Sequence, residues 1–383
     1  MSNIFKTFSS VIRGLGVGTD SSAVGIDIGT SAIKVVEIKK KGGKAILETY
    51  GSIALGPYAD LDGGAVTNLS VEKISEALRE VLKQSGIQSA MSKTPAALSI
   101  PVQSSLIFTI ELPASIKESE IASIIPTEAR KYIPVPITEV ALDYFVLPKK
   151  ESSFVELNRE VDPTNPPTRG ADKQNILVVA TQNNVVSKYR SIVSECQLQS
   201  SFFEIEIFSS IRANFEHELS PVLLIDFGAS CTKLSIVEFG MVNAYHTVDR
   251  GGADISTSIS QSLSIPFSEA EKIKKEFGLF GNDTNKSLAD IIKVHTDYIF
   301  AETNNVLLGY EKKYNRTISK VIFSGGGSLL KGLKEVATNN FRAEIELGHA
   351  FSKVNAPAFL EKVLESMGPE FAVALGLALR KLQ

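Results

Sequence analysis

The sequence predicts an α/β protein with more than one domain, built around two copies of one strand-turn-strand unit. Residues 24–35 (VGIDIGTSAIKV) and 223–234 (LLIDFGASCTKL) place Asp, Gly, Ser and Lys at the same offsets. A third segment, 321–328 (VIFSGGGS), runs from a short apolar stretch into three glycines. At 383 residues, 43% of them hydrophobic, the chain is long enough for two or more hydrophobic cores.

Each copy predicts a β-hairpin. A buried apolar strand leads into Asp-x-Gly, which is typical of a tight turn, and alternating apolar residues follow it, such as Ile33 and Val35 or Leu234 and Ile236. One such turn would predict only a structural hairpin, because Asp and Gly are the commonest turn residues. Two copies in register favour a shared function.

Phosphate binding is the chemistry that two such turns suit. Glycine lets the backbone approach a phosphate and present N–H groups, while Ser and Thr hydroxyls add donors. Asp27 and Asp226, at the strand ends, are candidates for holding a hydrated Mg²⁺, which keeps its waters and takes few carboxylates. The candidate phosphate-binding residues are Gly29, Thr30 and Ser31 in the first hairpin and Gly228, Ala229 and Ser230 in the second.

Two further glycine-bearing segments predict close approach to the same ligand. We expect a helix with an anion-binding N-terminus to begin near Leu329, after the third loop. Residues 251–254 follow a predicted strand at 241–248 and precede a helical pattern, so they form either a plain turn or another ligand contact. Gly-x4-Gly-Lys-[ST] and Gly-x-Gly-x-x-Gly are both absent, which disfavours a P-loop or dinucleotide fold. The candidates are Gly325, Gly326, Gly327 and Ser328, with Gly251, Gly252 and Asp254.

Composition disfavours several classes of protein. A formal charge of −3 gives no basic field for nucleic acid. Cys196 and Cys231 are too few for a secreted disulfide framework and too far apart in sequence for a zinc-binding pair. No uncharged apolar run approaches the roughly 18 to 20 residues of a membrane-spanning helix, and the N-terminus lacks a cleavable signal pattern. We therefore expect the protein in the cytoplasm.

Residues 1–20 predict a short amphipathic leader. Lys6 and Arg13 lie among its polar positions. The leader either frays or docks on its own domain, or it contacts a membrane surface, and both alternatives stay open. The apolar residues of one helical face are Ile4, Phe5, Phe8, Val11, Ile12 and Leu15.

The three loops, in this order and at these separations, resemble the phosphate and adenosine motifs of the actin, sugar-kinase and heat-shock-chaperone ATPase superfamily. Residues 270–275 (AEKIKK) are similar to the helix that contacts ribose and base in FtsA and MreB, which makes Glu271 and Lys274 candidate nucleotide contacts. Residues 371–380 (FAVALGLALR) look like the second helix that connects the two lobes. The resemblance implies an α/β fold of the actin-like (ribonuclease H-like) two-lobed ATPase type.

The segment between the hairpins predicts a small α+β unit. Pro126 lies within its first helix and should kink that helix unless the helix starts late. Residues 148–173 are polar and proline-bearing and predict a long surface loop. The predicted strands lie within 97–113, at 141–147 and at 176–181, and the predicted helices at 118–132 and from Asn183 or Asn184.

Residues 128–137 (EARKYIPVPI) are similar to a pattern of the PilM family of type IV pilus assembly proteins, where Pro134 and Pro136 impose an extended link between helix and strand. The inserted unit resembles the small α+β subdomain of FtsA and PilM. The resemblance implies a leader at 1–20, a first lobe of 21–96, 199–220 and 366–383, an inserted domain of 97–198, and a second lobe of 221–365.

The resemblance also implies that ATP and Mg²⁺ bind between the lobes. Lys34 either offsets phosphate charge or lies in solvent, and we expect Lys233 to be a solvated hairpin lysine. Hydrolysis needs a residue that orients the attacking water. The candidate catalytic residues are Glu204 and Glu206, which we expect on one face of a strand. The alternative, that this face is only the polar side of an edge strand, explains the pattern equally well. Glu206 fits the family's Asp-x-Glu pattern better, and hydrolysis is left open.

As a PilM-like protein, the chain is expected to be a cytoplasmic ATP-binding scaffold at the inner face of the cytoplasmic membrane. Its expected partner is the N-terminal cytoplasmic peptide of a PilN-like membrane protein, captured beside the inserted domain, near 97–113 and the helix from Glu118. Pilus motor ATPases and further copies of the chain are additional candidates.

Two alternatives belong to other functional classes. An FtsA-like division filament ordinarily ends in a membrane-binding helix after a linker, whereas this sequence ends at Gln383, directly after the predicted connecting helix. A small-molecule kinase needs a base, typically an aspartate, facing a substrate pocket.

Overall fold

The computed structural model describes residues 21–87, 94–147, 173–216, 218, 220–281 and 287–382. The predicted leader and the predicted loop up to residue 172 lie outside them. The chain divides into two compact units, a smaller one within Val102–Arg190 and a larger one within Gly16–Pro101 and Ser191–Gln383.

The first sheet of the larger unit has the strand order β3-β2-β1-β4-β8. β1, β2 and β3 are antiparallel neighbours, whereas β1, β4 and β8 run parallel. The first predicted hairpin is therefore present, as β1 and β2. The strands are β1 (Ser21–Ile28), β2 (Ala32–Lys41), β3 (Lys44–Ala54), β4 (Ala96–Ile100) and β8 (Ser200–Ile205).

The second sheet repeats this topology with the order β11-β10-β9-β12-β13. Three antiparallel strands are again followed by two parallel ones. The two similar sequence segments are thus the first hairpins of two five-stranded sheets that share one topology. The strands are β9 (Val222–Phe227), β10 (Thr232–Glu238), β11 (Met241–Val248), β12 (Lys320–Ser324) and β13 (Glu344–Leu347).

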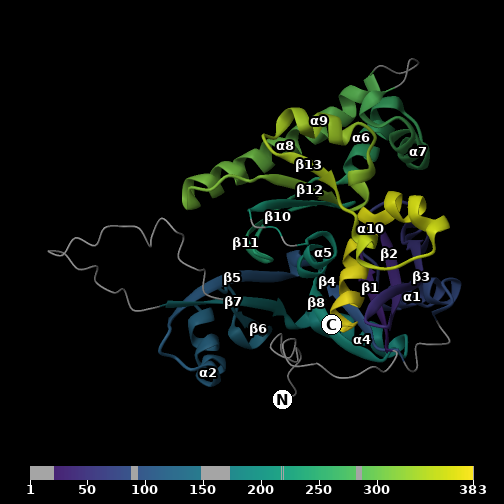
Figure 1. Cartoon of the computed structure of the whole chain (residues 1–383). Coiled ribbons are helices and arrows are strands. Elements are labelled where there is room, and N and C mark those ends of the chain that lie inside the picture. The colour runs from purple at the N-terminus through teal and green to yellow at the C-terminus, as the bar shows by residue number, and fades with distance from the viewer. Residues whose placement is uncertain are drawn as a thin grey trace. The chain divides into compact units, whose positions relative to one another are not determined.

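Helices cover both sheets of the larger unit, and α8 and α9 lie over the second one (Figure 1). Phe300 of α8 meets Phe323 of β12 edge to face, with ring centroids 6.3 Å apart, in a core that also buries Leu223 and Ile225 of β9. These buried strands are nearly all apolar, because both of their faces are covered. The helices are α1 (Val71–Gln84), α5 (Glu206–Asn214), α6 (Gly252–Leu263), α7 (Phe267–Phe277), α8 (Ser287–Tyr314), α9 (Leu333–Asn340) and α10 (Glu361–Leu382).

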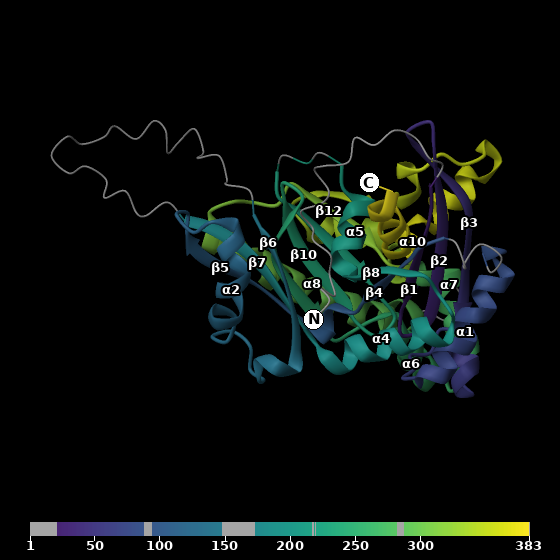
Figure 2. The ribbon, with the colours of Figure 1, turned by 90° about the horizontal axis from the view of Figure 1, so that it is seen from below.

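α10 contains the predicted connecting helix and contacts both sheets. It lies beside β1 and α5 (Figure 2). A Cβ atom at Gly25 would lie only 1.8 Å from the carbonyl oxygen of Ala374, so glycine is required where β1 crosses α10. Nearer its start, α10 accepts a hydrogen bond from the backbone N–H of Gly325, which donates to the Pro369 carbonyl oxygen at 2.8 Å.

The smaller unit is an antiparallel sheet of order β5-β7-β6 with one helix, α2 (Glu118–Ala129), packed against it. Its core joins Ile121 and Ile125 of α2 to Ile176 and Val178 of β7. α4 (Asn183–Glu195) follows β7 in the chain. The strands are β5 (Ser105–Pro113), β6 (Val140–Val146) and β7 (Lys173–Gln182).

α2 begins at Glu118, as predicted, and contains Pro126, so the alternative of a late start is excluded. The Glu120 carboxylate accepts a hydrogen bond from the backbone N–H of Lys117 at 3.0 Å, which fixes the early start. The helix also ends at Ala129 and not at Tyr132.

Candidate functional site

The tips of the two repeated hairpins meet. The Thr30 hydroxyl lies 3.2 Å from the Ser230 hydroxyl, although 200 positions separate them in sequence. Each tip is closed by the same backbone hydrogen bond, from Gly29 to Ala32 in the first hairpin and from Gly228 to Cys231 in the second, both 3.0 Å long. The structure thus brings the candidate phosphate-binding turns into direct contact.

Each hairpin carries an Asp–Lys pair across its two strands. Asp27 lies opposite Lys34 in the first hairpin, and Asp226 lies opposite Lys233 in the second. The shared offset in the sequence is therefore a shared register in the sheet. Side chains opposite each other on neighbouring strands lie close, so each lysine charge reaches its aspartate.

Asp27 is buried and is held by its neighbouring strand. The hydroxyl of Ser99 on β4 donates to the Asp27 Oδ1 atom at 2.8 Å. Burial raises the pKa of Asp27, and the charge of Lys34 and the Ser99 hydrogen bond only partly offset this rise. A nearby cation would stabilise the ionised carboxylate.

Lys233 is enclosed by carboxylates, which corrects the expectation of a solvated lysine. Its Nζ atom lies 2.7 Å from Glu206 Oε2 and 3.4 Å from Asp226 Oδ2, and the Lys233 side chain is only 15% exposed. Burial opposes the charge, but Glu206 and Asp226 together hold the pKa of Lys233 well above its ordinary value. Lys233 is therefore a charged, buried partner of both groups.

Glu204 and Glu206 do not share the face of one strand, so this expectation is wrong. β8 ends at Ile205, and Glu206 is the first residue of α5, where the helix dipole favours an acidic side chain. Because the strand gives way to a helix between these two residues, Glu206 contacts Lys233 of the second hairpin, whereas Glu204 contacts arginines of α5 and α10.

The Glu204 carboxylate binds two arginines. Arg212 Nη1 lies 2.8 Å from its Oε2 atom, and Arg380 Nη1 lies 2.6 Å from its Oε1 atom. Burial would raise the pKa of Glu204, but the two guanidinium groups lower it. Glu204 links β8 to α5 and α10 through these bonds, and the structure does not bring it to the hairpins.

The segment at 251–254 contacts the second hairpin directly. The backbone N–H groups of Gly252 and Ala253 donate to the carbonyl oxygens of Gly228 and Ala229, each at 2.9 Å. The Asp254 carboxylate accepts from the N–H of Gly251 at 2.8 Å and so caps the start of α6. The N-terminus of α6 therefore lies against the candidate phosphate-binding turn.

The two candidates on α7 join this group. The ammonium of Lys274 donates to the carbonyl oxygen of Gly252 at 2.7 Å and lies 2.6 Å from the carboxylate of Glu271. The Ser256 hydroxyl donates to the same carboxylate oxygen at 2.5 Å. Glu271 and Lys274 thus bind α7 to the start of α6.

The third glycine loop reaches Asp226. Gly325 has φ +79°, and a Cβ atom there would lie 2.4 Å from Asp226 Oδ1, so only glycine fits. The loop continues as a 3₁₀ turn, Gly326–Leu329, in which the Ser328 hydroxyl donates to the Gly325 carbonyl oxygen at 2.6 Å. An α-helix near Leu329 is therefore wrong, because α9 begins only at Leu333, after a left-handed Gly332.

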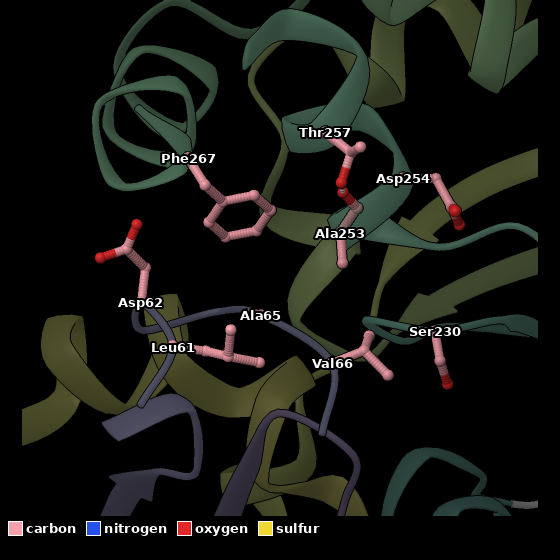
Figure 3. A pocket seen from close by; sticks show the side chains of 9 residues that line it. All are labelled: Leu61, Asp62, Ala65, Val66, Ser230, Ala253, Asp254, Thr257 and Phe267. Atoms are coloured by element: carbon pink, nitrogen blue, oxygen red, sulfur yellow. Dashed lines mark hydrogen bonds between the residues drawn. The ribbon is translucent and has the colours of Figure 1, made fainter. Parts of the chain in front are cut away.

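A pocket of about 450 Å³ lies beside these groups (Figure 3). Figure 3 shows the Phe267 ring pointing into it opposite Leu61 and Ala65. Of its lining, the sequence analysis had named only Ser230 and Asp254, because the other residues form no local motif and come together only in the folded chain. The pocket is lined by Leu61, Asp62, Ala65, Val66, Ser230, Ala253, Asp254, Thr257 and Phe267.

The loop after β3 also touches α7. The Asp62 carboxylate accepts a hydrogen bond from the backbone N–H of Ser268 at 3.0 Å. The N-cap position of α7 is Pro266, which offers no side-chain acceptor, so Asp62 supplies the missing cap. A Cβ atom at Gly64 would lie 3.1 Å from the Glu271 carboxyl carbon, which places this loop directly over Glu271.

Two sheets of one topology, joined by a helix and meeting through paired hairpins, define an actin-like fold of the ribonuclease H-like type. The structure is similar to MreB 5 of Spiroplasma citri bound to AMPPNP, with a TM-score of 0.50, 11% identity and coverage of 94% of this chain and 96% of that chain. The predicted fold is thereby confirmed.

The family model for the type IV pilus assembly protein PilM matches residues 25–382, and the chain belongs to this family. A solved PilM-PilN type IV pilus biogenesis complex contains a chain similar to this one, with a TM-score of 0.75, 23% identity and coverage of 94% of this chain and 98% of that chain. Cell division protein FtsA of Staphylococcus epidermidis is 24% identical over 344 residues, covering 82% of this chain and 71% of FtsA. The family predicted from residues 128–137 is confirmed.

Proposed function

We propose that this chain is a nucleotide-binding scaffold of the type IV pilus assembly platform, located at the inner face of the cytoplasmic membrane. The observation that carries the proposal is the meeting of the hairpin tips at Thr30 and Ser230, 3.2 Å apart. Family membership supports the pilus role. Among the described residues, no helix combines the length and apolar character needed to cross a bilayer.

Phosphate binding follows from the donors gathered at these tips. Gly29 and Thr30 are exposed at the first tip, and Ser31 and Ser230 are half-buried beside them. Hydroxyl and backbone N–H donors from two opposed turns can bind a polyphosphate from both sides. The N-terminus of α6, at Gly252, adds a helix dipole that favours negative charge. ATP is the ligand that we propose for this site.

The aspartates fit a hydrated Mg²⁺. Asp27 and Asp226 lie one residue before the end of the first strand of each hairpin. A hydrated Mg²⁺ takes few carboxylates because it keeps several waters and binds phosphate oxygens. Within the described ranges, no cluster of three or more His, Cys, Asp or Glu side chains could hold a metal ion by itself. Bound there, Mg²⁺ would neutralise phosphate charge.

Nucleotide binding, and not turnover, is the proposed output. Glu206 is the candidate that the structure brings to the second hairpin, and its carboxylate is already bonded to Lys233 at 2.7 Å. This ion pair gives Glu206 a partner within the second hairpin, and we assign it no water-orienting role.

The proposed partner is the N-terminal cytoplasmic peptide of a PilN-like membrane protein. A similar chain occurs in a PilM-PilN complex, which supports this assignment. We propose the smaller unit, part of the inserted domain of 97–198, as the docking region. β5 is an edge strand of its sheet, and an extended peptide can pair with such an edge. Phe108 of β5 stacks on Tyr132 with centroids 4.7 Å apart, and Tyr132 is 47% exposed, which offers an aromatic contact.

Calorimetric titration with Mg-ATP tests the nucleotide site. Asp27→Ala and Asp226→Ala should each weaken binding by about 10- to 100-fold. Asp297→Ala, at an exposed position on α8, is the control and should bind like the wild type. Unchanged affinity in both hairpin variants would exclude the assigned site.

Titration with a synthetic N-terminal PilN-like peptide tests the partner. Tyr132→Ser should weaken peptide binding, whereas Tyr298→Ser, a matched exposed tyrosine on α8 (47% against 49% exposed), should not. Equal binding by both variants would remove the β5 edge from the proposal, and capture of a division-protein tail in place of the PilN-like tail would overturn the pilus role.

A further inference from the structure

The loop after β3 is tied at both of its ends to the tip of the first hairpin. The backbone N–H of Leu55 donates to the Ser31 carbonyl oxygen at 2.8 Å. The backbone N–H and the hydroxyl of Thr67 both donate to the Thr30 carbonyl oxygen, at 2.9 and 3.0 Å. Residues 55–67, which we call the strap, therefore begin and end on two candidate phosphate-binding residues.

The strap is folded back on itself. The backbone N–H of Leu61 donates to the Gly56 carbonyl oxygen at 2.9 Å, and that of Ala65 donates to the Asp62 carbonyl oxygen at 3.2 Å. A Cβ atom at Gly56 would lie only 1.9 Å from this Asp62 oxygen, so the two turns of the strap are in direct contact. Compact surface loops whose ends lie close together are frequently functional.

The middle of the strap reaches α7. The Asp62 carboxylate accepts a hydrogen bond from the backbone N–H of Ser268 at 3.0 Å, and Gly64 lies against the carboxyl group of Glu271. α7 is in turn bonded to the start of α6 through the ammonium of Lys274. The strap thus joins the tip of the first hairpin to the helices that flank the tip of the second.

The contact between the strap and these helices leaves apolar surface uncovered. Leu61 and Val66 are 49% and 40% exposed, although both line the pocket into which the Phe267 ring points (Figure 3). A closer approach of the strap to α7 would bury these side chains, and burial of apolar surface stabilises the closed form. The strap is therefore poised to close over the pocket.

We propose that the strap gates the nucleotide site: it closes against α7 when the hairpin tips hold a phosphate, and it must release α7 before the nucleotide leaves. This inference rests on the proposed nucleotide-binding function. A phosphate bound at Thr30 and Ser31 fixes the two anchored ends of the strap, and the hydrogen bond between Asp62 and Ser268 fixes its middle. Asp62 is thus a positioning residue that sets how long a nucleotide stays bound.

Stopped-flow release of a fluorescent ATP analogue, chased with excess Mg-ATP, tests the gate. Asp62→Ala removes the hydrogen bond to α7 and should speed release about fivefold, the factor that corresponds to the loss of one helix cap. The association rate should not fall, because the ligand enters while the strap is open. Asp62→Asn keeps an acceptor for the Ser268 amide and should release the analogue at close to the wild-type rate. Asp60→Asn, which removes the same charge at an exposed position of the strap, is the control and should also release it at that rate.

Two neighbouring glycines supply a second, matched pair of variants. Gly64→Ala brings its Cβ to 3.1 Å from the Glu271 carboxyl carbon at φ +91°, so it should push the strap away from α7 and speed release. Gly63→Ala brings its Cβ to 3.8 Å from the Ala54 Cβ, an ordinary contact, and should release the analogue like the wild type. Wild-type release from Asp62→Ala, or equal rates in each variant and its control, would overturn the gate and leave the nucleotide site standing. A wild type that binds neither the analogue nor ATP would overturn both.

Discussion

The two hairpins share one strand register, but their aspartates have different partners. In the first, the parallel neighbour β4 provides Ser99, which donates to Asp27. In the second, β12 places Ser324 beside Asp226, but the Ser324 hydroxyl donates to the Pro369 carbonyl oxygen at 3.2 Å, and Asp226 meets Lys233 instead. A repeat can therefore fix register while the neighbouring elements decide which charges are paired.

The largest expected difference between the hairpins is the stability lost with each lysine. Lys233→Met breaks a buried pair and should lower the free energy of unfolding by about 3–5 kcal/mol. Lys34→Met, at a half-buried position, should lower it by about 1 kcal/mol or less. Urea denaturation of both variants measures the difference. Equal losses would show that the ion pairs of Lys233 contribute no more to stability than the surroundings of Lys34.

Local sequence signals were enough to predict the hairpins and not enough to predict this difference. Asp-x-Gly and the alternation that follows it are short-range patterns, and the register follows from them. The burial and ion pairing of Lys233 depend on Glu206, which is 27 positions away in sequence. Glu206 contacts Lys233 because β8 ends at Ile205 and α5 begins with Glu206. The alternating pattern at residues 203–207 is compatible with a strand that continues through Glu206 as well as with one that ends at Ile205. Tertiary packing therefore determines where β8 ends.

The next expected effect concerns the loop that touches only the second hairpin. Gly325→Ala forces a Cβ atom to 2.4 Å from Asp226 Oδ1 at a left-handed φ and should lower stability by about 1–3 kcal/mol. Gly29→Ala, at the tip of the first hairpin, brings its Cβ only to 3.1 Å from the Ala32 carbonyl oxygen, and should lower it by about 1 kcal/mol or less. Thermal unfolding compares the two, and a greater loss for Gly29→Ala would reverse the ranking of the hairpins.

The segments after the third strand of each sheet, β3 and β11, also differ, and only one of them carries a local sequence pattern. After β11 the chain soon enters α6, and its glycines and Asp254 were marked in the sequence as a turn or ligand contact just before a helical pattern. After β3 the chain enters a loop that precedes α1, and Asp62 of this loop accepts a hydrogen bond from Ser268 at the start of α7. Only the folded chain brings these two residues together, 206 positions apart, so no local pattern marked Asp62.

A smaller effect is expected from this contact. Asp62→Ala removes the cap of α7 and should lower stability by about 1 kcal/mol, while Asp62→Asn keeps an acceptor and should lower it much less. Hydrogen exchange at the Ser268 amide, measured by mass spectrometry, should become faster in Asp62→Ala. An unchanged exchange rate would mean that the amide is protected without Asp62.

The smallest expected effect has a distinctive pH dependence. Because burial raises the pKa of Asp27, the folded state holds its proton where the unfolded state has lost it, and folding becomes less favourable as pH rises from the ordinary carboxyl range through the raised pKa. Asp27→Asn removes this penalty and keeps an acceptor for Ser99, so the variant should be slightly more stable than the wild type at neutral pH and equal to it in acid. Asp226→Asn should instead lose stability at neutral pH, because it removes a partner of Lys233. Thermal unfolding of both variants between acid and neutral pH measures the two slopes, and a gain for Asp27→Asn that grows in acid would contradict the raised pKa of the buried Asp27.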